Sequence, residues 1–383
     1  MKHRYIFVVG GVMSGVGKGV TTASIGKILQ SRGVNVTAIK IDPYVNVDAG
    51  TMNPVEHGEV FVTDDGDETD QDMGNYERFL EADLTSTNYM TTGRVYQTVI
   101  EKERNLEYKG KCVEVVPHIP LEVIRRIKTA AQKAKADITM VEVGGTVGEY
   151  QNILFLEAAR MMHLEDSENV LFVLVSYLPV PKHLGEMKTK PTQYATRTLN
   201  SAGIHPDFIV CRGEQFMDKP RREKLSVFCN VKPEAVITAP DVSSIYEIPA
   251  LFESQDLSAT ILKKFRMKPH ETDLIKWKRM ASVQVTAKRT VKIGVVGKYF
   301  ATGDYTLSDS YISVIEALKA AAWSNKAKIQ LDWINSEDFE THPKSISRLR
   351  DYDGILVPGG FGTRGIEGII AAIRYCREKK VPY

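Results

Sequence analysis

The chain has 383 residues, of which 43% are hydrophobic and 26% charged, and its formal net charge is +2. This balance is typical of a globular protein, and the small net charge argues against nucleic acid or a membrane surface as partner. No apolar run reaches the length of a membrane span, so we expect a cytoplasmic protein. Four scattered cysteines, without a C-x-x-C pair, predict reduced thiols and no zinc site.

An apolar run at residues 5–9 leads into a glycine-rich loop that ends in Gly17-Lys18-Gly19 and opens a small-residue helix. The backbone N–H groups of such a loop predict a binding site for the phosphates of a nucleoside triphosphate, with Lys18 as the charge on the outer phosphates. Five residues separate Gly11 from Gly17, and Gly19 replaces the usual Ser or Thr, so this is a deviant P-loop. An ordinary glycine-rich turn is the alternative.

Apolar, β-branched runs alternate with helical stretches through the first two thirds of the chain. The alternation predicts an α/β fold with a doubly wound, mostly parallel sheet, whose ligands bind at the carboxyl ends of the strands. The expected strands are residues 5–9, 36–41, 138–143, 170–175, 208–211 and 235–238.

The alternation lapses in a charge-rich stretch that contains Pro269. We therefore predict a first domain over residues 1–265, a linker over 266–290 and a second α/β domain over 291–383. The chain stops where a further strand is expected to begin, so we expect the second domain to be incomplete.

Two acidic features indicate a metal ion. The first is the stretch 64–72, with six carboxylates; most of these fit a solvated loop, and a calcium EF-hand is disfavoured because its glycine is missing. The second is Glu142, near the end of an apolar strand, where a charge is costly unless it is paired or bound to metal. Magnesium held by Glu142 and one aspartate of the acidic stretch is one reading. A buried ion pair with a lysine such as Lys40 is the other.

Residues 188–193 supply basic and hydroxyl groups. Two lysines, two threonines and a glutamine flank Pro191 in an expected loop, which suits a second triphosphate or the edge of a base. A solvated surface loop is the alternative.

With these motifs the chain resembles the CTP synthase family, the amidoligases that convert UTP to CTP, over essentially its whole length. The resemblance implies an amidoligase domain at 1–265 and the N-terminal part of a class I glutamine amidotransferase domain at 291–383. The motifs that carry it are residues 10–19, 40–46, 50–54, 57–62, 75–79, 91–94, 142–146, 188–193, 228–231 and 358–362.

The resemblance also implies a reaction: ATP phosphorylates O4 of the uracil ring, and ammonia displaces that phosphate. Lys18 and Lys40 are then catalytic, Asp72 and Glu142 hold Mg²⁺, and GTP is an allosteric activator in the family. The implied ATP-binding residues are Gly15, Val16, Gly17, Lys18, Gly19, Val20, Asp72, Asp241 and Val242.

UTP, or CTP as feedback inhibitor, is implied to bind a second set of residues in a homotetramer. An Asp-Ile-Glu run of the family is Glu149-Tyr150-Gln151 here, which makes CTP inhibition the family property with least support. The set is Ser14, Glu149, Tyr150, Gln151, Lys188, Thr189, Lys190, Pro191, Thr192, Gln193 and Lys224.

In the second domain, Gly360 lies where the family binds glutamine. The nucleophilic cysteine is expected beyond Tyr383, and Cys376 lies in a helical run where a core thiol is the ordinary interpretation. We therefore expect this chain to use free ammonia and the full-length enzyme to use glutamine.

Three other functions fit the sequence less well. A partitioning ATPase is disfavoured because residues 10–17 lack its additional lysine. An amidoligase acting on a corrinoid side chain or a diamino acid is disfavoured by residues 188–193, which favour a nucleotide. A scaffold without chemistry is disfavoured, for the first domain, by Lys18, Lys40, Asp72 and Glu142.

Overall fold

The computed structural model describes residues 2–298, 301–302, 305–306, 308–360 and 362–383. The chain divides into two compact units, the first made of Met1–Ala49 and Val62–Lys276, the second of Gly50–Phe61 and Trp277–Tyr383. The early segment Gly50–Phe61 thus belongs with the carboxyl-terminal part of the chain. No helix in the described part of the chain is long and apolar enough to cross a membrane.

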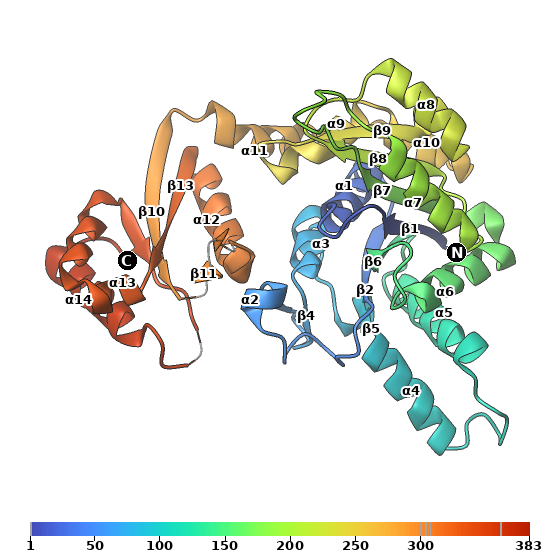
Figure 1. Cartoon of the computed structure of the whole chain (residues 1–383), viewed down its shortest axis with the longest axis horizontal. Coiled ribbons are helices and arrows are strands. Elements are labelled where there is room, and N and C mark those ends of the chain that lie inside the picture. The colour runs from blue at the N-terminus through green and yellow to red at the C-terminus, as the bar shows by residue number, and fades with distance from the viewer. Residues whose placement is uncertain (1, 299–300, 303–304, 307, 361) are drawn as a thin grey trace. The chain divides into compact units, whose positions relative to one another are not determined.

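The first unit is built on a seven-stranded parallel sheet (Figure 1). This confirms the predicted doubly wound architecture, and the six expected strands are all present. The short edge strand β5 was not predicted. In spatial order the strands are β5 (Tyr89–Thr91), β2 (Val36–Asp42), β6 (Ile138–Thr146), β1 (Arg4–Gly10), β7 (Val170–Tyr177), β8 (Phe208–Gly213) and β9 (Val236–Pro240).

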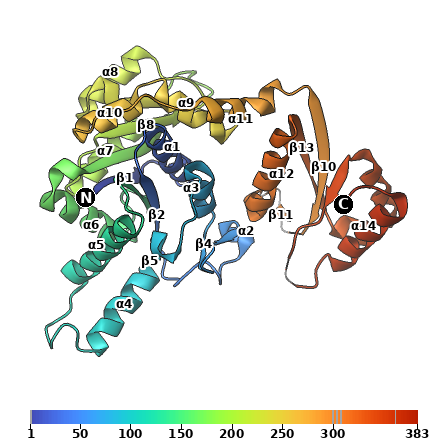
Figure 2. The same ribbon diagram turned by 180° about the vertical axis from the view of Figure 1, so that it is seen from behind.

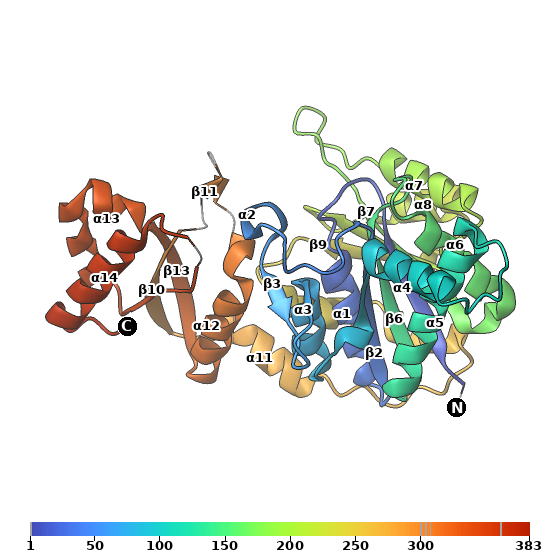
Figure 3. The same ribbon diagram turned by 90° about the horizontal axis from the view of Figure 1, so that it is seen from below.

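Helices cover both faces of this sheet (Figure 3). One face carries α1 (Lys18–Gln30), α3 (Asp72–Leu80), α9 (Ile248–Glu253) and α10 (Leu257–Lys264), with the short strand β4 (Glu68–Asp70) leading into α3. The other face carries α4 (Thr92–Arg104), α5 (Val115–Lys133), α6 (Ile153–Glu165), α7 (Lys190–Ser201) and α8 (Lys219–Cys229).

The central strands are buried on both faces, which explains why they are apolar throughout rather than alternating. In β1 every residue from Tyr5 to Gly10 is buried, and Phe7 stacks on Phe172 of β7 with 5.8 Å between ring centroids. A large core between the sheet and α4–α8 fixes the strands, and with them the loops at their carboxyl ends.

The second unit contains a parallel three-stranded sheet in the order β13-β10-β14. Figure 2 shows α12 and α14 on opposite sides of it. The elements are α2 (Pro54–His57), β3 (Val60–Val62), α11 (Ile275–Thr286), β10 (Arg289–Gly297), β11 (Ala301–Thr302), β12 (Tyr305–Thr306), α12 (Ile312–Ser324), β13 (Ala327–Asn335), α13 (Glu337–Thr341), β14 (Gly354–Leu356) and α14 (Ile366–Lys379), of which β3 and α11 cross a unit boundary.

The cysteine of α14, Cys376, is fully buried in a core with Val296 and Phe339. It is an ordinary core thiol, as the sequence predicts.

Residues 50–61 attach to the start of α12, because Glu59 accepts a hydrogen bond from the Ser313 N–H at 2.6 Å and the Ser310 hydroxyl donates to the Pro54 carbonyl at 3.1 Å. A carboxylate is favourable there because helix N-termini carry unpaired N–H groups.

A buried carboxylate joins α4 to α5 in the first unit. Glu122, 3% exposed, accepts hydrogen bonds from Lys102 of α4 at 2.7 Å, from Arg125 at 2.6 and 2.8 Å, and from Arg126 at 2.9 Å. Burial alone would raise the pKa of Glu122, but the hydrogen bonds from Arg125 and Lys102 outweigh it and lower the pKa to about 2.

Because the pKa of Glu122 is lower in the folded chain than its ordinary value of 4.5, its contribution to stability is present above about pH 4.5 and is lost as the pH falls toward 2. We expect Glu122→Gln to lower the free energy of unfolding at pH 7 by on the order of 2 kcal/mol. The difference from wild type should shrink below pH 4.5, as measured by urea unfolding across pH. Glu101→Gln, which changes an exposed carboxyl on α4, is the control. A pH-independent difference would contradict this assignment.

Candidate nucleotide site

The phosphate loop connects β1 to α1. Gly17 precedes the helix with φ of 87°, and Gly15 has φ of 70° with open space where a Cβ would lie. Within the described residues, no side chain caps the start of α1, and its first turn holds no acidic residue. The N–H groups of that turn are therefore left for an anionic ligand, as the deviant P-loop predicts.

Lys18 begins α1 and is buried at 9% exposure. A Cβ on Gly10 would lie 2.9 Å from Cδ of Lys18, so the glycine leaves room at the end of β1 for the lysine to fold over the strand. Burial lowers the pKa of Lys18, and attraction by Glu142 partly offsets the shift. Across the described part of the chain its Nζ has no hydrogen-bond partner, which suits a lysine that meets phosphate.

The glycine after Lys18 has a steric explanation. A Cβ on Gly19 would lie 1.9 Å from Oδ1 of Asp72, at the start of α3. The Asp72 carboxylate thus occupies the space where a standard P-loop has its Ser or Thr side chain. Position 19 therefore lacks a Ser or Thr hydroxyl because Asp72, from the acidic stretch, takes up the space that this side chain would need.

Lys40 lies at the centre of a buried charge cluster. Its Nζ is 2.5 Å from Asp72, 3.1 Å from Glu142, 3.5 Å from Asp70 and 3.8 Å from Asp42. Burial by itself would lower the pKa of Lys40, but the four carboxylates raise it well above its ordinary value. The sheet register brings these groups together, because Lys40 of β2 lies opposite Glu142 of β6.

The ion pair between Lys40 and Glu142, the alternative to a metal site, is therefore present. Among the described residues, no group of three or more His, Cys, Asp or Glu side chains is arranged so that it could hold a metal ion. The cluster is nevertheless short of positive charge, with four carboxylates and the two ammonium groups of Lys18 and Lys40. Burial is the main cause that raises the pKa of Asp42 to about 7 and raises that of Glu142.

This donor set fits Mg²⁺, which prefers one or two carboxylates together with phosphate oxygens. Asp72 lies directly beside the first turn of α1, where phosphates are expected, and Glu142 is 1% exposed. The fit rests on the shortage of positive charge and on the place of Asp72 beside Gly19.

Arg212, at the carboxyl end of β8, was missed by the sequence analysis. It donates to Oδ1 of Asp241 at 2.8 Å, and a Cβ on Gly17 would lie 2.9 Å from its NH1. Its Nε is buried and has no partner within the described residues. Arg212 thus links Asp241, which follows β9, to the phosphate loop, and Val242 is the next residue along the chain. A charge ending an apolar strand, the feature that identified Glu142, would have identified Arg212.

The loop after β6 folds back on itself. Glu149 accepts hydrogen bonds from the N–H of Thr146 at 3.0 Å, from its hydroxyl, and from the side chain of Gln151 at 2.9 Å. Tyr150 is 93% exposed. The N–H of Val147 donates to the Gly10 carbonyl at 2.8 Å, which attaches this loop to the phosphate loop.

The sequence predicts a loop over Lys188–Gln193, but only Lys188 and Thr189 precede the helix. Lys190–Gln193 form the first turn of α7, because Pro191 suits the first turn of a helix and Thr192 is buried with its hydroxyl 2.8 Å from that of Ser176. A Cβ on Gly11 would lie 2.5 Å from Cβ of Ala195, so α7 packs directly on the phosphate loop.

Of the remaining residues predicted to bind UTP, some make side-chain interactions within the protein and others are exposed. Gln193 donates to the Thr189 hydroxyl at 3.0 Å, and Lys188 pairs with Glu186 at 2.6 Å. Ser14 of the phosphate loop, Lys190 and Lys224 of α8 are exposed. Their grouping around one ligand stays a prediction.

In the second unit, Gly359 and Gly360 follow β14, and Lys298 donates to the Gly362 carbonyl at 2.7 Å. Phe361 of the 358–362 motif lies outside the described residues. The role of Gly360 in binding glutamine stays a prediction.

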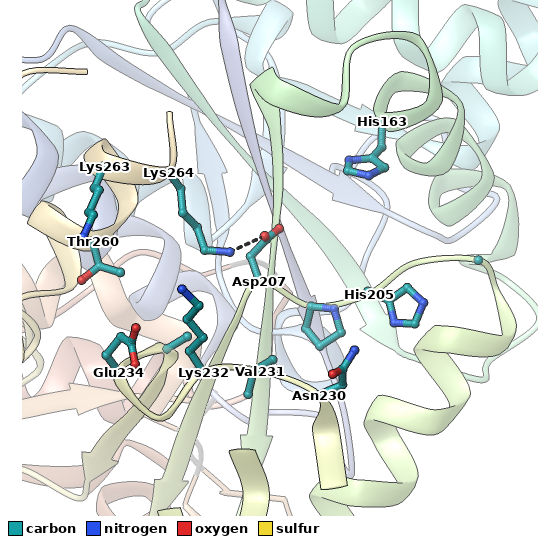
Figure 4. A pocket seen from close by; sticks show the side chains of 13 residues that line it. His163, His205, Asp207, Asn230, Val231, Lys232, Glu234, Thr260, Lys263 and Lys264 are labelled. Carbon is teal, nitrogen blue, oxygen red and sulfur yellow. Dashed lines mark hydrogen bonds and ion pairs between the residues drawn. The ribbon is translucent and has the colours of Figure 1, made fainter. Parts of the chain in front are cut away.

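A separate cavity of ≈ 670 Å³ lies near the amino ends of β8 and β9 (Figure 4). Lys264 and Asp207, paired at 2.7 Å, line it together with His163, His205 and Lys232. None of the predicted site residues lines this cavity, and it is at the opposite end of the strands from the phosphate loop.

Two protein-family models match the chain. Residues 4–267 match the family described as CTP synthase N-terminus, and residues 306–383 match glutamine amidotransferase class-I. The CTP synthase of Pyrococcus furiosus is 51% identical over 381 residues, covering 99% of this chain and 69% of that protein. The CTP synthase of Methanothermobacter thermautotrophicus is 48% identical, with 99% and 70% covered.

Among solved structures, cobyrinic acid a,c-diamide synthase from Mycobacterium smegmatis with bound ADP and magnesium is 13% identical, with a TM-score of 0.36 over 71% of this chain and 99% of that one. That similarity is too low to carry an argument. The family matches and the identity to the curated relatives are decisive: this chain belongs to the CTP synthase family.

Proposed function

We propose that the chain catalyses the reaction of its family, the ATP-dependent amination of UTP to CTP with ammonia, free or released from glutamine, as nitrogen source, and that UTP is first phosphorylated at O4. In that step O4 attacks the γ-phosphorus of ATP, ADP leaves, and N3 of the uracil ring loses its proton. Ammonia then adds to C4, and inorganic phosphate leaves with the loss of a proton. The observation that carries the proposal is the grouping of Lys18, Lys40, Asp72 and Glu142 beside the phosphate loop.

The protein's part in phosphoryl transfer is to position groups and neutralise charge. The first turn of α1 and Lys18 bind the phosphates of ATP, and Arg212 holds Asp241 beside them. Mg²⁺, bound by Asp72 and Glu142, would neutralise phosphate charge during the transfer. Lys40, held by the same carboxylates, places a second ammonium at the transferring group.

UTP is proposed to bind between the phosphate loop, the loop after β6 and the start of α7. The loop after β6 contacts the phosphate loop through the hydrogen bond from the Val147 N–H to the Gly10 carbonyl. The helix α7 contacts the phosphate loop where Ala195 packs on Gly11. In the same proposal CTP inhibits by binding there and the chain acts as a homotetramer, while GTP is proposed as an allosteric activator in the family. The four cysteines are all unpaired, which favours the cytoplasm as the site of action.

The direct test is CTP formation from UTP, ATP and Mg²⁺, with ammonium and with glutamine as nitrogen sources. Lys18→Met should lower the rate with ammonium at least 100-fold, because the transferring phosphate loses a buried positive charge. Lys27→Met, which removes a lysine paired with Glu81 in the last turn of the same helix, should keep the wild-type rate. Wild-type activity in Lys18→Met would refute the role of Lys18, and no CTP from wild type would refute the function.

Gly19→Ser restores the residue of a standard P-loop but should lower activity with ammonium at least tenfold. Its Cβ would overlap Asp72, which must then move away from the start of α1. Steady-state rates over a range of Mg²⁺ concentrations measure the effect. Gly359→Ser in the second unit, where no described atom lies within 4 Å of the Cβ position and the backbone φ is not in the left-handed region, is the control for a glycine replacement elsewhere. Activity equal to or above wild type in Gly19→Ser would show that Asp72 does not need this space.

A further inference from the structure

Within the described part of the chain, Tyr76 is the residue of α3 whose side-chain hydroxyl contacts the charge cluster around Lys40. The side chain is 0% exposed and lies one helical turn after Asp72. Its hydroxyl donates a short hydrogen bond to Oε2 of Glu142. A phenylalanine would fill this space equally well, so packing does not explain the hydroxyl; a buried hydroxyl needs a partner, and the partner here is a carboxylate.

The two oxygens of Glu142 have different partners. Oε1 accepts from Lys40 at 3.1 Å, and Oε2 accepts from Tyr76. The terminal torsion of a glutamate is otherwise loosely defined, so two donors from different elements fix the plane of the carboxylate. Lys40 comes from β2, Glu142 from β6 and Tyr76 from α3.

The same turn of α3 also orients the side chain of Asp72. Asn75 donates to Oδ1 of Asp72 at 3.3 Å and accepts from Arg78 at 2.8 Å, while the N–H of Asp72 donates to Asp70 at 2.8 Å. One helical turn therefore carries one of the two predicted metal ligands and the hydroxyl that orients the other.

We propose that Tyr76 is a positioning residue for phosphoryl transfer: it holds the Glu142 carboxylate in the orientation in which Oε1 accepts from Lys40 and in which Glu142 would bind the divalent cation. The inference rests on the proposed function and assigns Tyr76 no contact with substrate. Partners that orient metal ligands typically change metal affinity or activity by about 10- to 100-fold when they are removed.

The test uses Mn²⁺ as a paramagnetic probe, titrated into the whole chain with a non-hydrolysable ATP analogue. Tyr76→Phe should raise the Kd for Mn²⁺ about tenfold or more. Activity with ammonium should require correspondingly more Mg²⁺, while the KM for UTP stays at the wild-type value. Phe79→Leu disturbs the packing of the same helix, against Tyr246, without touching Glu142. It should lower the Tm and leave the Kd for Mn²⁺ unchanged.

A double-mutant cycle separates positioning from a general structural role. If Tyr76 acts through Glu142, Tyr76→Phe should change Mn²⁺ affinity less than about twofold in a Glu142→Gln background. The same fold-change in both backgrounds, or a wild-type Kd in Tyr76→Phe, would overturn the inference alone. Failure of the wild-type chain to bind Mn²⁺ with the analogue would overturn the metal site of the proposed function and this inference with it.

Discussion

The ammonium of Lys40, buried among four carboxylates, is the interaction on which the site depends. A buried ion of either sign is costly unless it is paired, and neither the lysine nor the carboxylates could stay charged there alone. Asp42 follows Lys40 on β2, Glu142 comes from β6, and Asp70 and Asp72 come from the segment that opens α3. The cluster therefore fixes the position of two strands and one helix relative to the phosphate loop.

This arrangement also explains the departure of the loop from the standard P-loop. Asp72 needs the space beside the first turn of α1, and only a glycine at position 19 leaves that space open. Arg212 similarly approaches Gly17 from β8. The loop is thus shaped by side chains from distant parts of the sequence, as well as by its own glycines. The result is a site with surplus negative charge beside unpaired N–H groups, which suits a nucleotide bound together with a divalent cation.

The sequence predicted the sheet well, because its central strands are long apolar runs that are buried on both faces. It missed β5, since three residues carry no periodicity, and it took the first turn of α7 for a loop, although Pro191 is a common first-turn residue. The charge of Arg212 at the end of an apolar strand could have identified it as a candidate, but its place beside the phosphate loop could not be predicted because Gly17 and Asp241 are distant in sequence. Family membership is confirmed, whereas the roles of individual site residues and the domain boundaries at 265 and 290 stay predictions. The assignment of residues 50–61 to the second unit depends on contacts with α12 that no local pattern reveals.

The measurement that tests the central claim most directly follows the oxygen at C4 of UTP. UTP labelled with ¹⁸O at O4 is converted with ATP, Mg²⁺ and ammonium, and the inorganic phosphate is analysed by mass spectrometry. If the cluster around Lys40 transfers a phosphoryl group to O4, each CTP formed should release one phosphate that carries the label. Label recovered in water, with unlabelled phosphate, would contradict phosphorylation of UTP at this site.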